Sequence, residues 1–101
     1  MRHVVLWKWQ PHTSPEDVRL VLEGLTRLAG VVPGLRAVQC GVNASRSTAA
    51  RGNTHYSILT FDDAGAFAAW HDDANYQAWS ATARPIIEKP TVLDIDGDAD
   101  L

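Results

Sequence analysis

Hydrophobic and polar positions divide this chain into strand-like and helix-like segments. Residues 3–9, 35–42 and 54–61 are short runs rich in apolar residues, which favour strands. Apolar residues at helical spacing from Val18 to Ala29 predict a helix between the first two runs. Ser14 is expected to cap this helix, Pro15 suits its first position, and Gly30 is expected to end it.

The second half of the chain predicts two short helices and one more strand. An alanine-rich segment, 64–70, is followed by a polar break at 71–73 and a second helical piece at about 74–84. Pro90 is expected to separate a turn from a final strand at 91–96. The order β-α-β-β-α-β indicates an α+β protomer with a ferredoxin-like fold. We expect a single domain over 1–101, with a frayed tail at 96–101.

In such a fold the helices cover only one face of the sheet. If His3 and His55 point toward the helices, strand alternation places Val4, Leu6, Tyr56 and Ile58 on the other face. That apolar surface is larger than a monomer usually leaves in water. The pattern therefore predicts a homodimer that packs sheet against sheet.

Composition and charge exclude several classes of protein. The chain has 101 residues, 46% of them hydrophobic, and a net charge of −3 with no basic stripe, which argues against nucleic acid as a partner. No apolar run is long enough to span a membrane, and no signal peptide is evident, so we expect a cytoplasmic protein. The single cysteine, Cys40, excludes an internal disulfide and a cysteine-based zinc cluster.

The candidate chemistry lies in two histidines that each open an apolar strand, His3 and His55. If these strands are neighbours, the two imidazoles are expected to lie together at one end of an apolar slot, as in a small acid–base pocket. Alternatively, each histidine caps its strand and hydrogen-bonds a neighbouring backbone group. No third ligand accompanies them, so no metal site is predicted.

The chain resembles the stress-responsive A/B barrel (Dabb) family over about residues 2–96. The resemblance is carried by the segments 2–9, 32–35, 54–55, 60–62 and 91–96, and most specifically by the first strand and Thr54-His55. It implies a ferredoxin-like protomer that forms a dimeric α/β barrel. Many members have no assigned chemistry, but olivetolic acid cyclase, a plant member, closes a linear polyketide by aldol condensation without a cofactor.

Carried over residue by residue, this resemblance assigns positions in the pocket. The strand histidines of the cyclase match His3 and His55, its helix tyrosine falls at Trp70, and its catalytic histidine falls at Tyr76. Tyrosine, with an unperturbed pKa of about 10, is a poor general base at neutral pH but a good hydrogen-bond donor. The olivetolic-acid reaction itself is therefore not supported.

The sequence thus predicts a small-molecule-binding protein with cofactor-free acid–base chemistry, such as polyketide-type cyclisation by aldol closure, or isomerisation. The ligand would be a small apolar or aromatic carbonyl compound. The predicted catalytic residues are His3, His55 and Tyr76, and the predicted substrate-binding residues are Val5, Trp7, Leu59, Trp70 and Asn75. Two alternatives stay open: a non-catalytic stress-responsive or binding protein, and a cofactor-free monooxygenase of an aromatic polyketide.

For three other polar features the sequence favours a structural role over a functional one. The break at His71–Asp73 is typical of a solvated helix cap rather than a charge relay or ion site. The polar stretch 43–53, with Arg46 and Arg51, is typical of a mobile loop rather than a lid over an anionic ligand. Arg84 is expected to pair with a helix C-terminus rather than with substrate.

Overall fold

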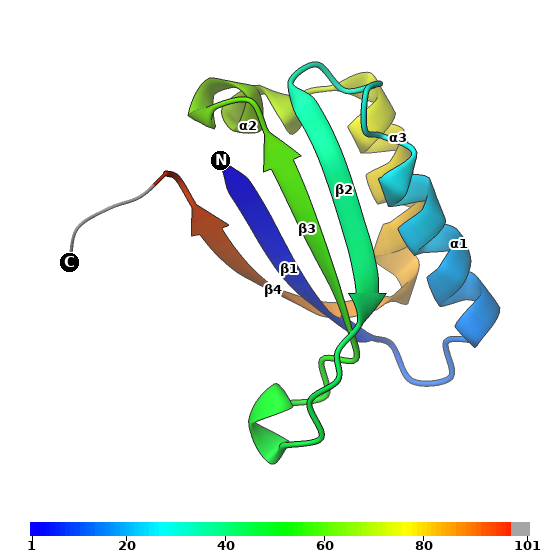
Figure 1. Cartoon of the computed structure of the whole chain (residues 1–101). Coiled ribbons are helices and arrows are strands. Elements are labelled where there is room, and N and C mark those ends of the chain that lie inside the picture. Colours follow the sequence, from blue (N-terminus) through cyan, green and yellow to red (C-terminus); the bar gives the residue numbers. More distant parts are fainter. Residues whose placement is uncertain (98–101) are drawn as a thin grey trace.

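Four antiparallel strands form one sheet, and the helices pack on one of its faces (Figure 1). The computed structural model describes residues 1–97. The strands are β1 (Arg2–Trp9), β2 (Leu35–Val42), β3 (His55–Phe61) and β4 (Ile87–Ile95), in the spatial order β2-β3-β1-β4. The helices are α1 (Pro15–Thr26), α2 (Ala64–Trp70) and α3 (Ala74–Ala83), with 3-10 turns η1 (Thr48–Ala50) and η2 (Arg84–Ile86). The predicted ferredoxin-like α+β fold is confirmed.

Side-chain caps fix where the helices begin. Ser14 accepts a hydrogen bond from the Asp17 N–H at the start of α1. Asp63 and Asp73 accept equivalent bonds at the starts of α2 and α3. Helix α1 ends at Thr26 rather than at Gly30, because the backbone then tightens to bonds between residues three apart and continues as turns.

The last strand begins at Ile87, four residues before the predicted start at Thr91, and Pro90 lies within it. The strand tolerates this proline because β4 is an edge strand and Pro90 lies opposite Trp7. The carbonyl of Trp7 accepts a hydrogen bond from Thr54 on the β3 side, at 3.0 Å, so Trp7 turns its backbone polar groups away from β4. The nitrogen of Pro90 therefore faces the outer edge of the sheet, and no ladder bond is lost.

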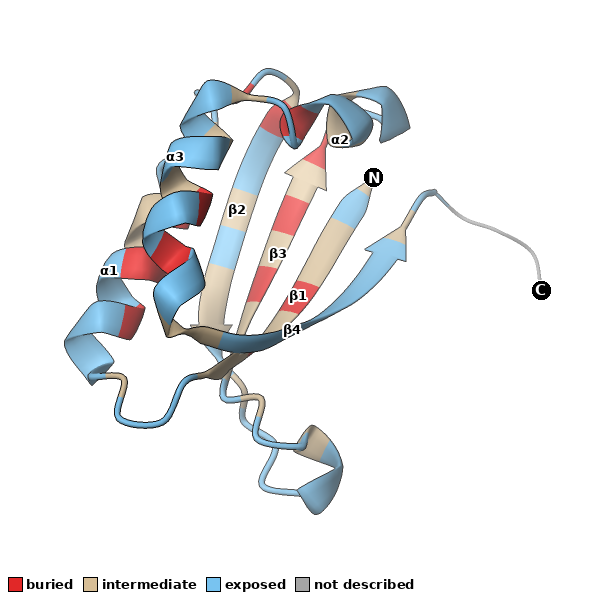
Figure 2. Cartoon of the chain, turned by 180° about the vertical axis from the view of Figure 1, so that it is seen from behind, coloured by how far each residue is buried: buried red, intermediate tan, exposed pale blue. Residues whose placement is uncertain are grey.

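The hydrophobic core lies between the helices and the face of the sheet that carries the odd-numbered residues of β1 and β3 (Figure 2). Val5, Leu59 and Leu25 are among its buried side chains. Ser57 is also fully buried at 0% exposure, where its hydroxyl accepts a hydrogen bond of 2.7 Å from the indole of Trp7. This bond satisfies the polar tip of a tryptophan whose ring fills the core.

No described helix covers the opposite face of the sheet (Figure 1). Val4 pairs with Ile58 and Leu6 pairs with Tyr56 there, as the strand alternation predicts. Leu93 on β4 adds to the same face and is 59% exposed. Within residues 1–97, none of the helices is both long and apolar enough to cross a membrane.

Candidate functional site

A cavity of about 530 Å³ lies between the sheet and helices α2 and α3. Its floor comes from β1, β3 and β4, and its other walls come from α2, α3 and the segment that joins α3 to β4. The floor includes His3, Val5, Trp7, Leu59, Val92 and Asp94. The helices contribute Phe67, Trp70, His71, Tyr76, Trp79 and Ser80. An aromatic cavity with a few polar groups is the usual form of a small-molecule site.

A histidine–aspartate pair lies at one end of this cavity. His3 and Asp94 are direct neighbours across β1 and β4, and Nδ1 of His3 is hydrogen-bonded to Oδ1 of Asp94. The imidazole also packs against Phe67 of α2, with 5.1 Å between ring centres. No group in residues 1–97 makes a hydrogen bond to Nε2 of His3. This nitrogen is therefore available to a ligand.

Next to the pair, α2 and α3 present a cluster of aromatic rings. The ring of Trp70 lies 4.0 Å from that of Tyr76 and 5.9 Å from that of His3, measured between centres. His71 lies 5.9 Å from Tyr76 on the same wall. Trp70 is 4% exposed, yet its indole N–H has no hydrogen-bond partner among the described residues. A buried donor of this kind costs about 1–3 kcal/mol unless a partner is supplied.

The helices leave β4 uncovered (Figure 2), and β4 contributes Val92 and Asp94 to the cavity lining. Val92 pairs with Val5 across the strands and so faces the cavity, but it is 56% exposed while Val5 is buried. A ligand that lies over β4 would remove this apolar side chain from water.

Arg84 and Glu88 are charged residues at the other end of the cavity. Arg84 follows α3 directly, and its Nε donates to the hydroxyl of the buried Ser80 at 3.2 Å. Glu88 is paired with Lys8 at 3.6 Å. Trp79 donates its indole N–H to the carbonyl of Val21 at 2.8 Å, which ties α3 to α1.

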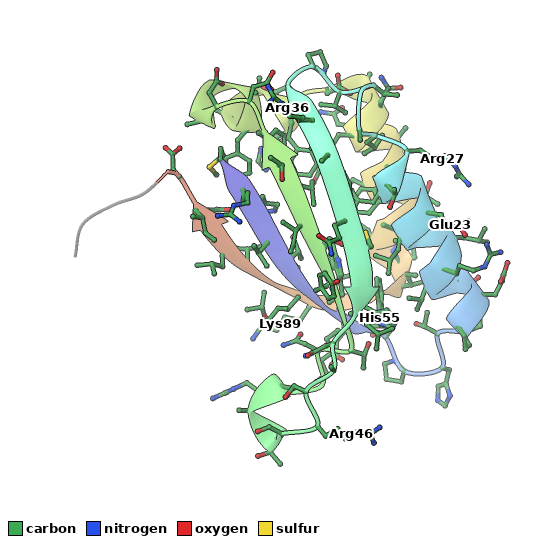
Figure 3. All side chains as sticks on the ribbon, viewed as in Figure 1. Glu23, Arg27, Arg36, Arg46, His55 and Lys89 are labelled. Atoms are coloured by element: carbon green, nitrogen blue, oxygen red, sulfur yellow. The ribbon has the colours of Figure 1, made fainter. Side chains whose placement is uncertain are left out.

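His55 does not join His3, and the prediction that both imidazoles lie at one end of one slot was wrong. Because β1 and β3 are antiparallel, residues that open the two strands lie at opposite ends of the pair, and His55 lies opposite Trp7. Four residues along β1, roughly 13 Å, separate that position from His3. Figure 3 shows His55 at the end of the sheet where β3 begins. It lines a separate hollow of about 360 Å³ beside α1 and β2, together with Cys40 and Glu23.

The other predicted site residues are placed as follows. The cavity is lined by Val5, Trp7, Leu59, Trp70 and Tyr76. Asn75 does not line it, because Asn75 is exposed in the first turn of α3, where its backbone N–H is bonded to Asp73. Arg46 and Arg51 also lie outside it, on a loop that projects beyond the end of the sheet (Figure 3).

The sequence did not lead us to Asp94, and it indicated only a helix cap at His71. Asp94 could have been found by pairing the first strand with the last, which the β-α-β-β-α-β order implies, and by looking for a carboxylate opposite His3. His71 ends α2, as a helix-cap interpretation requires, but its ring also lines the cavity. Arg84 lines the cavity too, although it was expected to pair with a helix end.

We expect His55 to make folding stability depend on pH. Burial lowers the pKa of His55, and its Nδ1 accepts a hydrogen bond of 3.0 Å from the indole of Trp9. The folded protein therefore favours neutral imidazole. The stabilisation is complete above the unfolded pKa of about 6.5 and is lost as the pH falls through the lower folded pKa.

Urea unfolding at pH 5, 6, 7 and 8 measures this loss. His55→Gln should flatten the fall in the free energy of unfolding between pH 7 and 5. His12→Asn serves as the control, since His12 is exposed and has a φ of 69°, which asparagine tolerates. An unchanged pH dependence in His55→Gln would contradict the assignment.

Comparison with known proteins adds a family to this geometry. The model of the stress-responsive A/B barrel domain (Dabb) family matches residues 1–96, nearly the whole chain. No curated protein matches the chain.

Several solved structures share the fold. The Arabidopsis thaliana protein At3g17210 superposes with a TM-score of 0.89 at 21% identity, over 99% of this chain and 97% of that one. Hydroxynitrile lyase from Passiflora edulis gives 0.86 at 19% identity, over 99% and 94% of the two chains. A dimeric ferredoxin-like protein of unknown function from Thermobifida fusca gives 0.74 at 22% identity, over 94% and 88%. At these identities the likeness concerns the fold alone.

Proposed function

The chain belongs to the stress-responsive A/B barrel domain family, and from this we propose that it binds a small carbonyl compound and performs cofactor-free acid–base chemistry on it. The observation that carries the proposal is the His3–Asp94 pair on the wall of an aromatic cavity. The hydroxynitrile lyase from Passiflora edulis has the same fold, so this fold is compatible with an enzyme that acts on a small molecule.

In the proposed reaction His3 is the general base. Asp94 accepts the hydrogen bond from Nδ1–H, which leaves the lone pair on Nε2 to take a proton from the carbon next to the substrate carbonyl. The electron pair of the broken C–H bond moves into the carbonyl and forms an enolate. The enolate carbon then attacks a second carbonyl of the same molecule, in an aldol closure, or is reprotonated elsewhere, in an isomerisation.

The enolate oxygen needs a hydrogen-bond donor, and the aromatic wall offers one. The rings of Trp70 and Tyr76 are in contact on this wall, and the hydroxyl of Tyr76 is our candidate donor. A donor that is held in place stabilises a developing negative charge without having to reorganise. The proton that His3 has taken stays on its Nε2, and His3 returns it to the aldol alkoxide or to the new carbon, which restores the neutral imidazole; His71 lies next to Tyr76 on this wall. His55 has no part in this proposal.

Proton exchange in D2O tests the proposal without knowledge of the natural substrate. The probe is 4-(4-acetylphenyl)butanamide, whose acetyl protons exchange slowly in buffer. We expect the wild-type protein to accelerate their replacement by deuterium, followed by proton NMR, and His3→Gln to reduce the acceleration about 100- to 10,000-fold. His12→Asn is the control for an exposed histidine.

The outcomes separate the rival functions. Binding of the amide, seen as a shift of the Trp70 indole resonance, without accelerated exchange would favour the non-catalytic binding protein and contradict the catalytic proposal. Exchange that persists in His3→Gln would also contradict it. Oxygen uptake with an anthrone-like substrate would indicate the monooxygenase alternative, since proton transfer consumes no oxygen.

We further propose a homodimer that packs through the helix-free face of the sheet. Support comes from the exposed Leu93 and its neighbours Val4 and Ile58 on that face, and from the dimeric Thermobifida fusca relative. Analytical ultracentrifugation should give about twice the protomer mass of 11.1 kDa, and Leu93→Glu should favour the monomer. A monomeric wild type at high micromolar concentration would contradict this assembly.

The cytoplasmic location stays a prediction from the sequence.

A further inference from the structure

Arg84 is an exposed cation that lines the cavity. Its Nε donates to Ser80, but no carboxylate in residues 1–97 pairs with its guanidinium. Arg2, Arg46 and Arg51 also form no ion pair among the described residues, but Arg84 is the arginine that lines the cavity. Glu88 shares the wall with Arg84, but its carboxylate is paired with Lys8. This end of the cavity therefore carries a net positive charge.

The other end of the cavity, at His3, disfavours an anionic group. Asp94 lies there beside His3, and its carboxylate disfavours a second anion. Between the two ends the cavity is lined by aromatic and apolar side chains, among them Val5, Trp7 and Trp79. A ligand with one neutral and one anionic end would thus bind in a single direction.

The strand register indicates the spacing between the two ends. His3 and Trp7 are four residues apart on β1, which corresponds to roughly 13 Å. Arg84 lies beyond Trp7, because it precedes Ile87, which pairs with Trp9. Ser80, itself buried, holds the guanidinium at that end through a 3.2 Å hydrogen bond. A ligand with its carbonyl at His3 and its anionic group at Arg84 therefore has to be longer than an aromatic ring alone.

We propose that Arg84 is a specificity-determining residue that binds the carboxylate of an aromatic or conjugated keto acid while the ketone lies at His3. This inference rests on the proposed function, because it assigns the substrate class of the same cavity. A guanidinium suits this role, since its planar donors match the two oxygens of a carboxylate.

A matched pair of ligands tests the inference. The probes are 4-(4-acetylphenyl)butanoate and the corresponding butanamide, which have nearly the same shape and differ in charge. Titration followed by the tryptophan indole resonances should show the carboxylate binding about three- to tenfold more tightly to the wild type. Arg84→Gln should abolish this preference, and it should lower the affinity for the carboxylate much more than the affinity for the amide.

Lys89→Gln is the control for charge. Lys89 lies on β4 opposite Lys8, outside the cavity lining, so its removal changes the net charge equally. If the preference for the carboxylate survives in Arg84→Gln, or is lost equally in Lys89→Gln, the inference is overturned. The same holds if the amide binds as tightly as the carboxylate, in which case the proposed function can still stand. Binding of neither probe would overturn both.

Discussion

Replacing Asp94 with asparagine is expected to slow acetyl proton exchange in the cavity about 100- to 10,000-fold, although the side chain keeps its shape. The carboxylate can only accept a hydrogen bond, so it holds the proton of His3 on Nδ1. An asparagine amide can donate to Nδ1 instead, and the proton then moves to Nε2, where it occupies the lone pair that the reaction needs. Nitrogen NMR of the His3 ring would show this change of tautomer directly.

Asp96→Asn is the matched control for that substitution. Asp96 is exposed just beyond the end of β4. Its replacement by asparagine removes the same charge at a position that does not contact His3. If Asp94→Asn exchanges protons at the wild-type rate, Asp94 has no catalytic importance. If Asp96→Asn is equally slow, the effect comes from net charge rather than from the tautomer.

The second large effect concerns stability. Gly34→Ala should destabilise the fold by about 3 kcal/mol, the sum of two separate costs. Gly34 has a φ of +79°, which disfavours any side chain, and a Cβ at this position would overlap the Cβ of Ala66 on α2. For a domain of this size, the midpoint of thermal unfolding should fall by more than about 10 °C.

Gly30→Ala separates the two costs. Gly30 has nearly the same φ, +78°, but nothing lies within 4 Å of a Cβ added there. Gly30→Ala should therefore lower the free energy of unfolding only by the backbone cost, about 1–2 kcal/mol. Equal losses at the two positions, measured by urea unfolding, would show that the approach of α2 to Gly34 contributes nothing.

The fold could be predicted because its signals are local. Ser14, Asp63 and Asp73 mark the beginnings of helices by capping chemistry, and alternation along β1 and β3 separates the two faces of the sheet. The start of β4 was missed for an equally physical reason. A proline such as Pro90 interrupts a central strand but not the outer side of an edge strand, and edge position depends on the whole topology.

The site could be predicted only in part, because it depends on contacts between distant segments. Val5, Trp7 and Leu59 follow from alternation alone and do line the cavity. His3 is hydrogen-bonded to Asp94, which lies 91 residues further along the chain. This contact depends on the register between β1 and β4, which no short sequence pattern predicts. The histidines were placed together because both open strands, whereas the antiparallel direction of those strands separates His3 from His55.

The outward-facing nitrogen of Pro90 also affects how the protein avoids self-association into fibres. An exposed edge strand offers free N–H groups to which the strand of another molecule can add. At Pro90 that donor is missing in the middle of β4, so an incoming strand cannot form an unbroken ladder there. The proline thus protects an edge strand that carries the exposed apolar side chains Val92 and Leu93. Pro90→Ala would restore the donor and should make the protein form β-rich aggregates more readily.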